Sequence, residues 1–240
     1  MLDIYAGKQA LKTIQKQGFK QVLFSTMLGA SGGPKWFTLF GLDKYLFGDF
    51  FDGRKDELNL IGSSAGAFRF AALTQNNPVD AITRLADYYS HTVYSNKASP
   101  TEITNKALQL LDHVFDKNGI EQIVNNDVFK AHFIVCRCTG LTKYESKPLQ
   151  LVGLLSSITL NRIDRSLLRH QYQRYVYRNQ FSKIQITDTN NFETHYFDLT
   201  TTNLKQALLA SGSIPLVMQG VNSIEGSPKG MYRDGGIIDY

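Results

Sequence analysis

The sequence of 240 residues predicts an α/β protein in which helices are layered against a largely parallel sheet. Three observations lead to this expectation. Apolar runs typical of strands alternate along the chain with longer segments of helical spacing. No Pro- or Gly-rich stretch divides the chain, and it contains neither a repeat nor a low-complexity tract. We therefore expect residues 1–240 to form one domain.

In the first third of the chain, the spacing of apolar residues predicts three helices and two strands. The first helix is expected to end at Gly18, because glycine commonly follows the last turn of a helix. The apolar run after it predicts a buried strand, and a glycine-rich loop leads from this strand into the next helix. The expected helices are 7–17, 36–46 and 65–73, and the expected strands are 21–28 and 58–61.

Strand and helix patterns continue through the rest of the chain. The helix over 101–115 has apolar residues at helical spacing, with Thr101 as a candidate N-cap. This continued mixture favours a largely parallel sheet. The further expected helices are 78–94, 101–115, 149–168 and 203–211, and the further expected strands are 129–139, 171–177, 183–187 and 192–199.

The composition, with 42% hydrophobic and 20% charged residues, is that of a soluble globular protein. The start of the chain, Met1–Lys8, lacks the basic region and apolar core of a secretory signal. No run approaches the roughly 18 apolar residues that span a bilayer. Cys136 and Cys138 lie two apart in an expected strand, so their side chains share a face and cannot readily bond to each other. We expect free thiols and a cytoplasmic protein.

The net charge of +5 is concentrated in residues 162–183, which contain six cations and a single acid. Tyr and Phe residues are interleaved with the cations. Two interpretations remain open: a solvated face, or a surface for the anionic headgroups of a membrane. Nucleic acid is not an expected partner, because no recognition motif accompanies the segment. The cations are Arg162, Arg165, Arg169, Arg174, Arg178 and Lys183.

Ser64 lies at the centre of a G-x-S-x-G motif, Gly62-Ser63-Ser64-Ala65-Gly66, between an expected strand and an expected helix. This is the layout of a nucleophile elbow. Small residues at Gly62 and Gly66 allow the sharp turn that presents the serine at the helix N-terminus. Ser64 is therefore the candidate nucleophile.

A second glycine cluster follows the first expected strand and precedes a helix, in the stretch Gly29–Trp36. The backbone N–H groups of Gly32 and Gly33 could bind the oxyanion that forms when a serine attacks an ester. Lys35 would add positive potential beside them. A nucleotide phosphate loop is disfavoured, because the spacing differs from both common phosphate-binding motifs. A plain turn without function is the remaining alternative.

The third cluster, Asp234-Gly235-Gly236, has two interpretations. An aspartate before two glycines can form an ordinary turn. Together with the other clusters, Asp234 becomes a candidate general base, because a serine hydroxyl needs help to lose its proton.

These clusters together resemble the patatin-like phospholipase family, from about Val22 to Gly236. The family has, in the same order, a glycine-rich oxyanion loop with a basic residue, a G-x-S-x-G elbow, and an aspartate in D-G-G or D-G-A. The stretch Ala210–Pro215 is similar to the small-residue stretch that ends in proline before the family's aspartate. The chain departs from the family's G-G-G-x-[RK]-G loop at Ser31 and Trp36, and Trp36 is expected to narrow the opening for the acyl chain.

The resemblance implies a three-layer α/β/α patatin-like fold and a lipid acyl hydrolase, of phospholipase A or carboxylesterase type. Ser64 and Asp234 would form its catalytic dyad, with Gly32 and Gly33 in the oxyanion hole and Lys35 at the basic position. A covalent acyl-enzyme would form on the serine, with no metal or cofactor. Because the family's members generally continue past the dyad motif, we expect a further C-terminal portion after Tyr240.

Two alternatives to the dyad enzyme stay open. A Ser-His-Asp esterase is compatible with the order of residues, because histidines follow the elbow. A catalytically silent relative could instead bind lipid. The presence of both Ser64 and Asp234 argues against the silent relative. The histidines after the elbow are His91, His113, His132, His170 and His195.

The substrate is expected to be a phospholipid or another acyl-ester lipid. The apolar residues from Leu149 to Leu160 suit a cap over an acyl pocket or a helix lying in a membrane interface. A core helix is the alternative. Paired with the basic segment that begins at Arg162, they suggest peripheral contact with anionic membrane.

Overall fold

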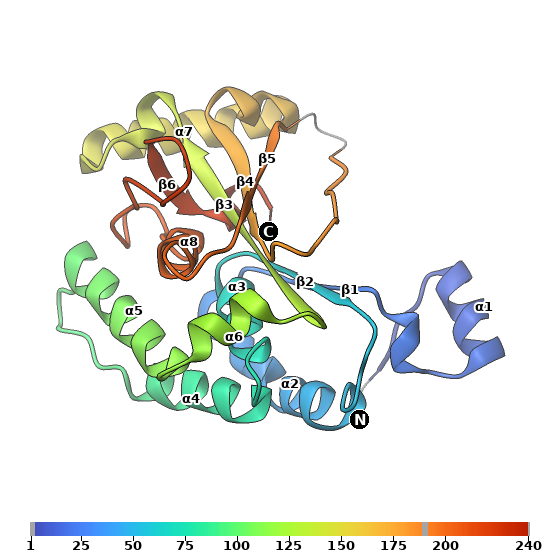
Figure 1. Ribbon diagram of the computed structural model, residues 1–240. Coiled ribbons are helices and arrows are strands. Elements are labelled where there is room, and N and C mark those ends of the chain that lie inside the picture. Colours follow the sequence, from blue (N-terminus) through green and yellow to red (C-terminus); the bar gives the residue numbers. More distant parts are fainter. Residues whose placement is uncertain (1–2, 189–191, 240) are drawn as a thin grey trace.

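A computed structural model describes residues 3–188 and 192–239 of the chain. Its core is a mostly parallel sheet of six strands, flanked by helices, which confirms the expected α/β class and fits a three-layer α/β/α fold (Figure 1). The strand order is β1-β2-β3-β4-β5, and β6 pairs with β3. The strands are β1 Thr26–Gly29, β2 Leu58–Gly62, β3 Phe129–Cys138, β4 Tyr172–Arg178, β5 Thr194–Asp198 and β6 Met231–Asp234.

The long central strand β3 brings two other strands end to end. On one edge β3 pairs with β4 along most of its length, so β2 and β6 share the opposite edge. β2 runs parallel to β3 and ends with Gly62 opposite Phe133. β6 runs antiparallel and ends with Asp234 opposite Val135. The carboxyl ends of β2 and β6 therefore meet beside Ile134.

Helices cover the two faces of the sheet unequally. In Figure 1, α7 lies above the sheet, whereas α4, α5 and α6 lie below it and α3 and α8 lie close to the central strands. Short 3₁₀ turns join several of these elements. The helices are α1 Lys8–Gln17, α2 Phe40–Tyr45, α3 Ala65–Leu73, α4 Pro78–His91, α5 Pro100–Phe115, α6 Gly119–Asn125, α7 Lys147–Ile163 and α8 Leu204–Ser211.

Alternating side chains of the central strands build two separate cores. Phe133 and Val135 of β3 point into the larger core, which includes residues of α3, α4, α5 and α8. Cys136 and Cys138 point into a smaller core below α7. Both cysteines are buried and free, as expected from their spacing within one strand.

The expected buried strand over residues 21–28 is wrong in two respects. Residues Gln21–Leu23 form a 3₁₀ turn, and the strand begins only at Thr26. The Arg54 guanidinium donates to the carbonyl oxygens of Gln21, at 2.5 Å, and Phe24, at 2.6 Å, which a sheet ladder would otherwise use. The strand is also not buried, because β1 is an edge strand and Leu28 is 79% exposed.

The expected strand over residues 183–187 is also wrong, because side chains bind its backbone N–H groups. Ile184 donates to the Ser182 hydroxyl at 3.3 Å, and Ile186 donates to the Tyr196 hydroxyl at 2.6 Å. The segment is therefore irregular. The strand expected over 192–199 is present but shorter, as β5.

Four of the expected helices have different ends or interruptions, and the helix expected over 78–94 ends at His91. Ser99, not Thr101, caps α5 and accepts from the N–H of Glu102 at 3.1 Å, because Pro100 already occupies the first helical position. The helix expected over 149–168 ends at Ile163, where Asp164 caps a separate 3₁₀ turn. The helix over 36–46 is divided into a 3₁₀ turn at Gly33–Leu39, then α2, then a π turn at Leu46–Phe50. The pattern missed α6 and β6 altogether.

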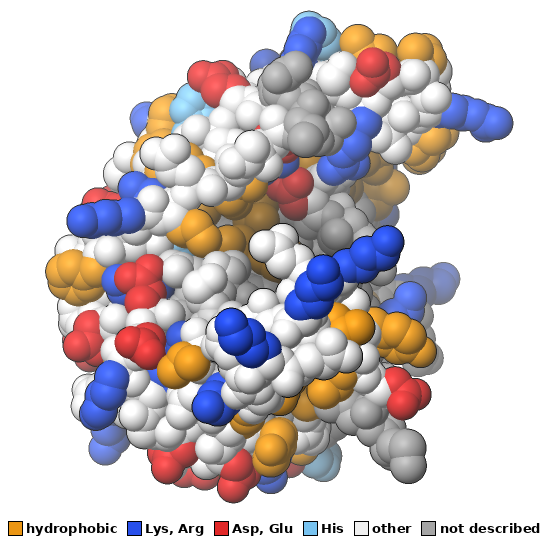
Figure 2. Space-filling model, turned by 90° about the vertical axis from the view of Figure 1, so that its right-hand side faces the viewer, with side chains coloured by type: hydrophobic (Ala, Val, Ile, Leu, Met, Phe, Trp, Pro, Cys, Tyr) orange, Lys and Arg blue, Asp and Glu red, His pale blue; other side chains and the backbone are white. Residues whose placement is uncertain are grey.

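Helix α1 stands apart from the sheet (Figure 1) and has no buried residue. Figure 2 looks at the side of the molecule that carries it, where Lys and Arg side chains project from the surface. No helix within the described residues combines the length and the apolar character that crossing a bilayer requires.

Candidate active site

Ser64 occupies the tight turn between β2 and α3. Its backbone has φ 51° and ψ −125°, a conformation that L-residues rarely adopt and that functional sites often hold under strain. A Cβ at Gly62 would overlap the backbone of Gly66, and a Cβ at Gly66 would overlap the carbonyl group of Gly29. The two motif glycines therefore let α3 approach the ends of β1 and β2, and this close approach forms the elbow.

The hydroxyl of Ser64 donates a hydrogen bond of 2.7 Å to Oδ2 of Asp234, and both residues are buried. Asp234 ends β6, and its other carboxylate oxygen accepts the N–H of Gly236 at 2.7 Å. This second bond fixes the plane of the carboxylate. The structure thus brings together two residues that are 170 positions apart in the sequence.

The small-residue stretch before Pro215 joins the elbow to the strands beside it. The N–H of Ser64 donates to the backbone and the side-chain oxygen of Ser211, both at 3.1 Å. The Ser211 hydroxyl donates to the carbonyl of Ile134 at 2.8 Å, and Ser213 accepts the N–H of Asp234 at 3.2 Å. The stretch therefore positions both members of the pair.

Burial raises the pKa of Asp234 to about 6, while hydrogen bonds from Ser64 and from the N–H of Gly236 act in the opposite direction. A buried carboxylate loses hydration, which disfavours its charged form. A pKa near the working pH suits a general base, since the group is ionised and still able to accept a proton.

The glycine-rich loop lies beside Ser64, but its members take different positions. Gly33 lines the same pocket as Ser64 and has φ +53°, which favours glycine. Gly32 precedes it with an extended φ of 165°, and its carbonyl accepts the N–H of Lys35 at 3.3 Å. Lys35 is exposed and is not among the residues that line the pocket.

Ala65 also lines the pocket and is the first residue of α3. The first N–H groups of a helix have no acceptor within the helix. Gly33 and Ala65 both line the pocket together with Ser64, so their backbone N–H groups are the candidate donors to an oxyanion there. Sequence reasoning did not include Ala65, although its place directly after the nucleophile was the signal for it.

A chain of hydroxyl groups ties the glycine-rich loop to the end of the described chain. Ser31 and Ser63 are 2.8 Å apart between their Oγ atoms, and Ser63 also donates to the carbonyl of Asp239 at 2.8 Å. A Cβ at Gly236 would overlap the Ser31 hydroxyl, and a Cβ at Gly235 would overlap the carbonyl of Ile134. Close contacts with these atoms therefore leave no room for a side chain at either Gly235 or Gly236.

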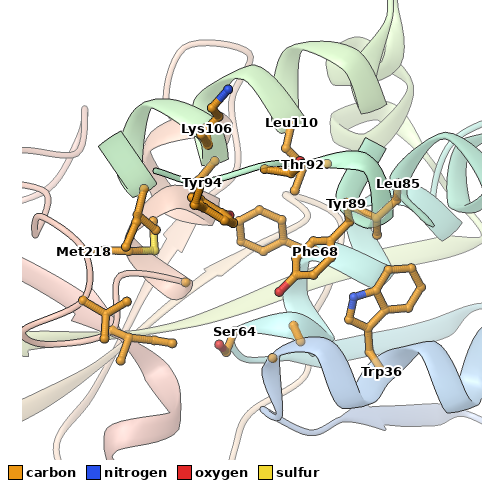
Figure 3. Close-up of a pocket in the computed structure, with 17 residues that line it drawn as sticks. Trp36, Ser64, Phe68, Leu85, Tyr89, Thr92, Tyr94, Lys106, Leu110 and Met218 are labelled. Atoms are coloured by element: carbon orange, nitrogen blue, oxygen red, sulfur yellow. The ribbon is translucent and has the colours of Figure 1, made fainter. Parts of the chain in front are cut away.

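An apolar pocket of about 300 Å³ opens above Ser64 (Figure 3). Its walls come from α3, α4, α5 and the segment after α8. Trp36 is buried in one wall and stacks on Phe37 with ring centroids 4.5 Å apart. Sequence reasoning identified Trp36 but missed the other large wall residues, because nothing local marks them as pocket residues. These are Phe68, Leu85, Tyr89, Ile103, Leu110 and Met218.

None of the five histidines lines this pocket within the described ranges. His132 is buried in β3 and hydrogen-bonds Ser182 at 2.7 Å, and burial lowers its pKa to about 4. His91 and His195 lie beside acids, Asp87 and Glu193. His113 contacts Tyr88, and His170 is exposed.

The basic segment after Arg162 is not one surface. Arg174 is buried and paired with Asp188 and Asp239, and Arg178 donates to the carbonyl of Ile184 at 3.0 Å. The interleaved tyrosines 172, 175 and 177 are buried in the sheet. The expectation of a continuous basic and aromatic face is therefore wrong, because β4 lies inside the sheet and alternate side chains point into its two cores.

Comparisons of the chain with protein-family models, with curated proteins and with solved structures gave no match. Across residues 3–188 and 192–239, no three His, Cys, Asp or Glu side chains are grouped closely enough to hold a metal ion.

Proposed function

We propose that the chain is a serine lipid acyl hydrolase that cleaves carboxylic ester bonds through Ser64 and Asp234. The observation that carries the proposal is the hydrogen bond of 2.7 Å from the Ser64 hydroxyl to Asp234 at the base of an apolar pocket. The resemblance to patatin-like phospholipases, whose motifs occur here in the same order, gives further support.

In the proposed acylation step, Asp234 accepts the proton of Ser64 as the serine oxygen attacks the ester carbonyl. The carbonyl oxygen becomes an oxyanion, which the N–H groups of Gly33 and Ala65 stabilise, with Gly32 shaping the loop. Preorganised N–H donors of this kind are worth about 10²- to 10³-fold in rate each. The tetrahedral intermediate collapses, Asp234 returns the proton to the leaving alcohol, and an acyl group remains on Ser64.

In the proposed deacylation step, Asp234 accepts a proton from water, and the water oxygen attacks the acyl carbonyl. Collapse of the second tetrahedral intermediate breaks the bond to Ser64 and returns the proton to its oxygen. The carboxylic acid then leaves. The apolar walls around Trp36 and Leu110 would hold the acyl chain, which favours lipid esters over polar substrates.

The test is the hydrolysis of short- and long-chain p-nitrophenyl esters by the wild type, Ser64→Ala and Asp234→Asn. Both variants are expected to lose on the order of 10³-fold or more in kcat while staying folded by circular dichroism. Ser90→Ala, which removes an exposed hydroxyl on α4, is the control and should keep full activity.

Other outcomes would replace the proposal. Full activity in Asp234→Asn together with loss in Ser64→Ala would favour a Ser-His-Asp esterase. A folded wild type that hydrolyses none of these esters or a panel of phospholipids would favour the catalytically silent lipid-binding relative.

A further inference from the structure

Helix α7 presents mostly polar or small residues to the sheet, with Leu160 packed against the smaller core, and most of its apolar side chains to solvent. Gln150, Gly153 and Ser157 are its buried residues. The side chains on its outer face are exposed by 40% to 64%, which is the reverse of the usual pattern for a helix on a globular core. These outer residues are Leu149, Leu151, Val152, Leu155 and Ile158.

Internal hydrogen bonds fix the rotation of α7, so its apolar face cannot turn inward. Gln150 donates to the carbonyl of Tyr144 at 3.1 Å and accepts the N–H of Leu216 at 2.5 Å. Ser157 bonds the buried hydroxyl of Tyr172 at 2.8 Å. A Cβ at Gly153 would lie 3.0 Å from the backbone nitrogen of Thr142, in the 3₁₀ turn that precedes α7. α7 also contributes no residue to the pocket above Ser64, so the expected cap over the pocket is wrong.

Exposed cations flank the apolar face at both ends. Lys143 and Lys147 lie at the start of α7, and Arg162 and Arg169 lie at its end and in the turn after it. The helix itself contains no Asp or Glu, and the cations outnumber the single exposed acid at each end, which is Glu145 before the helix and Asp164 after it. An apolar strip between cations matches a membrane interface, in which acyl chains lie below anionic headgroups.

The start of α7 adjoins the segment that forms part of the pocket mouth, through the inward-facing side chain of Gln150. The bond between Gln150 and Leu216 places the start of α7 against the segment after α8. Ile214 and Val217 of that segment line the pocket and are exposed by 41% and 43%. A bilayer that contacts both the start of α7 and the exposed side chains of this segment would lie next to the opening that leads to Ser64.

We propose that the outer face of α7 and the segment 214–217 seat on the surface of a lipid bilayer that carries anionic headgroups. A second copy of the chain fits less well, because a two-fold contact would set the apolar strips together with cations at both ends facing cations. This inference rests in part on the proposed function, because only a lipid hydrolase would take its substrate from the bilayer. It also explains why large apolar side chains of α7 face solvent.

The test is sedimentation with vesicles of phosphatidylcholine alone and of phosphatidylcholine with one quarter phosphatidylserine. The double variant Leu155→Ser, Ile158→Ser is expected to bind the mixed vesicles at least about tenfold more weakly than the wild type. Lys147→Gln with Arg162→Gln is expected to bind about tenfold more weakly at low salt and to lose the preference for phosphatidylserine. Val22→Ser, a control at an exposed apolar residue before β1, should bind as the wild type does.

Hydrolysis of a short, water-soluble p-nitrophenyl ester and the molar mass in solution are measured on the same samples. Unchanged ester hydrolysis with weakened vesicle binding supports the proposal. Vesicle binding that ignores the α7 substitutions, no binding by the wild type, or a change from dimer to monomer in the α7 variants overturns it. If the wild type hydrolyses no ester but binds vesicles through α7, the hydrolase proposal fails and the docking surface stands.

Discussion

The two faces of the sheet bury apolar side chains to very different extents. Below it, α3, α4, α5 and α8 enclose a core with residues such as Phe70, Phe133 and Tyr177, and the pocket above Ser64 continues this core toward the surface. Above it, α7 covers a small core around the two cysteines and leaves its own apolar side chains exposed. Packing within the chain shapes the first face, whereas the helix on the second face leaves apolar side chains open to the surroundings, where we propose that a bilayer binds.

The difference shows where each kind of substitution should be felt. Around Ser64 the backbone segments are in contact, so a substitution that adds or removes a side-chain group there should disturb the packing of α3 against the strands. On the outer face of α7, apolar atoms contact few neighbours, so their removal should leave the fold intact.

The largest expected effect is that of Gly66→Ala. The new methyl group would overlap the carbonyl of Gly29 and force α3 away from β1. We expect a loss of more than about 4 kcal/mol in the free energy of unfolding, or no folding. Gly41→Ala is the matched control, because its Cβ would meet nothing within 4 Å and it lies in α2. It should be neutral or stabilising by up to about 1 kcal/mol in urea unfolding. Equal effects would contradict the close approach at the elbow.

Truncation of one side chain on each face sharpens the comparison. Phe133→Ala removes a fully buried ring from the larger core and should cost about 3 to 5 kcal/mol in the free energy of unfolding. Leu155→Ala removes a side chain that is 54% exposed and should change stability by less than about 0.5 kcal/mol. Urea unfolding of both variants decides the matter. A cost for Leu155→Ala close to that of Phe133→Ala would show that the outer face of α7 is covered.

Asp234→Asn should stabilise the folded protein at neutral pH while removing its activity. The pKa of Asp234 is raised from 3.8 to about 6 in the fold, so the protonated form is the one that burial favours. The associated stability is fully present below the unfolded pKa and is lost as the pH rises through about 6. A neutral amide does not suffer that loss. The variant should therefore exceed the wild type in the free energy of unfolding by about 1 to 3 kcal/mol at pH 8 and by little at pH 3.5. Thermal unfolding at the two pH values measures it, and a larger gain at the lower pH would contradict the sign.

The pH dependence of ester hydrolysis should report the same carboxyl group. Asp234 accepts a proton only when ionised, so kcat/KM should fall about tenfold per pH unit below its pKa of about 6 and level off above it. A stopped-time assay with a short p-nitrophenyl ester at constant ionic strength gives the profile. A bell-shaped curve, or a midpoint near the ordinary value for an aspartate, would count against a buried dyad base.

Among the substitutions near Ser64, the smallest effect is expected at the hydroxyl chain. Ser31→Ala removes one partner of Ser63 and leaves the loop attached by its backbone. We expect a loss of about 1 kcal/mol in stability and a few-fold lower kcat with little change in KM, since the glycine-rich loop that we propose to hold the oxyanion loses one hydrogen bond. Thr38→Ala, which removes an exposed hydroxyl in the turn after the loop, is the control and should change neither quantity.

The local motifs could be predicted from the sequence because their physical requirements are local. Two glycines around a serine between an apolar strand and a helix indicate an elbow, and the backbone angles of Ser64 agree with it. The α/β class follows in the same way from the alternation of patterns.

Most features that depend on distant parts of the chain could not be predicted, and Asp234 was named only because its motif accompanies the other two clusters and resembles that of a known family. β6 was missed because Met231–Asp234 is too short to give a strand pattern. The segment is a strand because it pairs with β3. The pocket walls were missed because Phe68 and Leu110 resemble any core residues until the helices are placed. The basic stretch was misinterpreted because a sequence does not show that Asp188 and Asp239 lie beside Arg174.

The most direct test of the central claim is mass spectrometry of the protein mixed with a long-chain p-nitrophenyl ester and quenched in acid during turnover. The account predicts the mass of one acyl group on the wild type, located on the peptide that contains Ser64, and none on Ser64→Ala. Turnover with no acyl group on Ser64, or with the group on another residue, would contradict the assignment of Ser64 as the nucleophile.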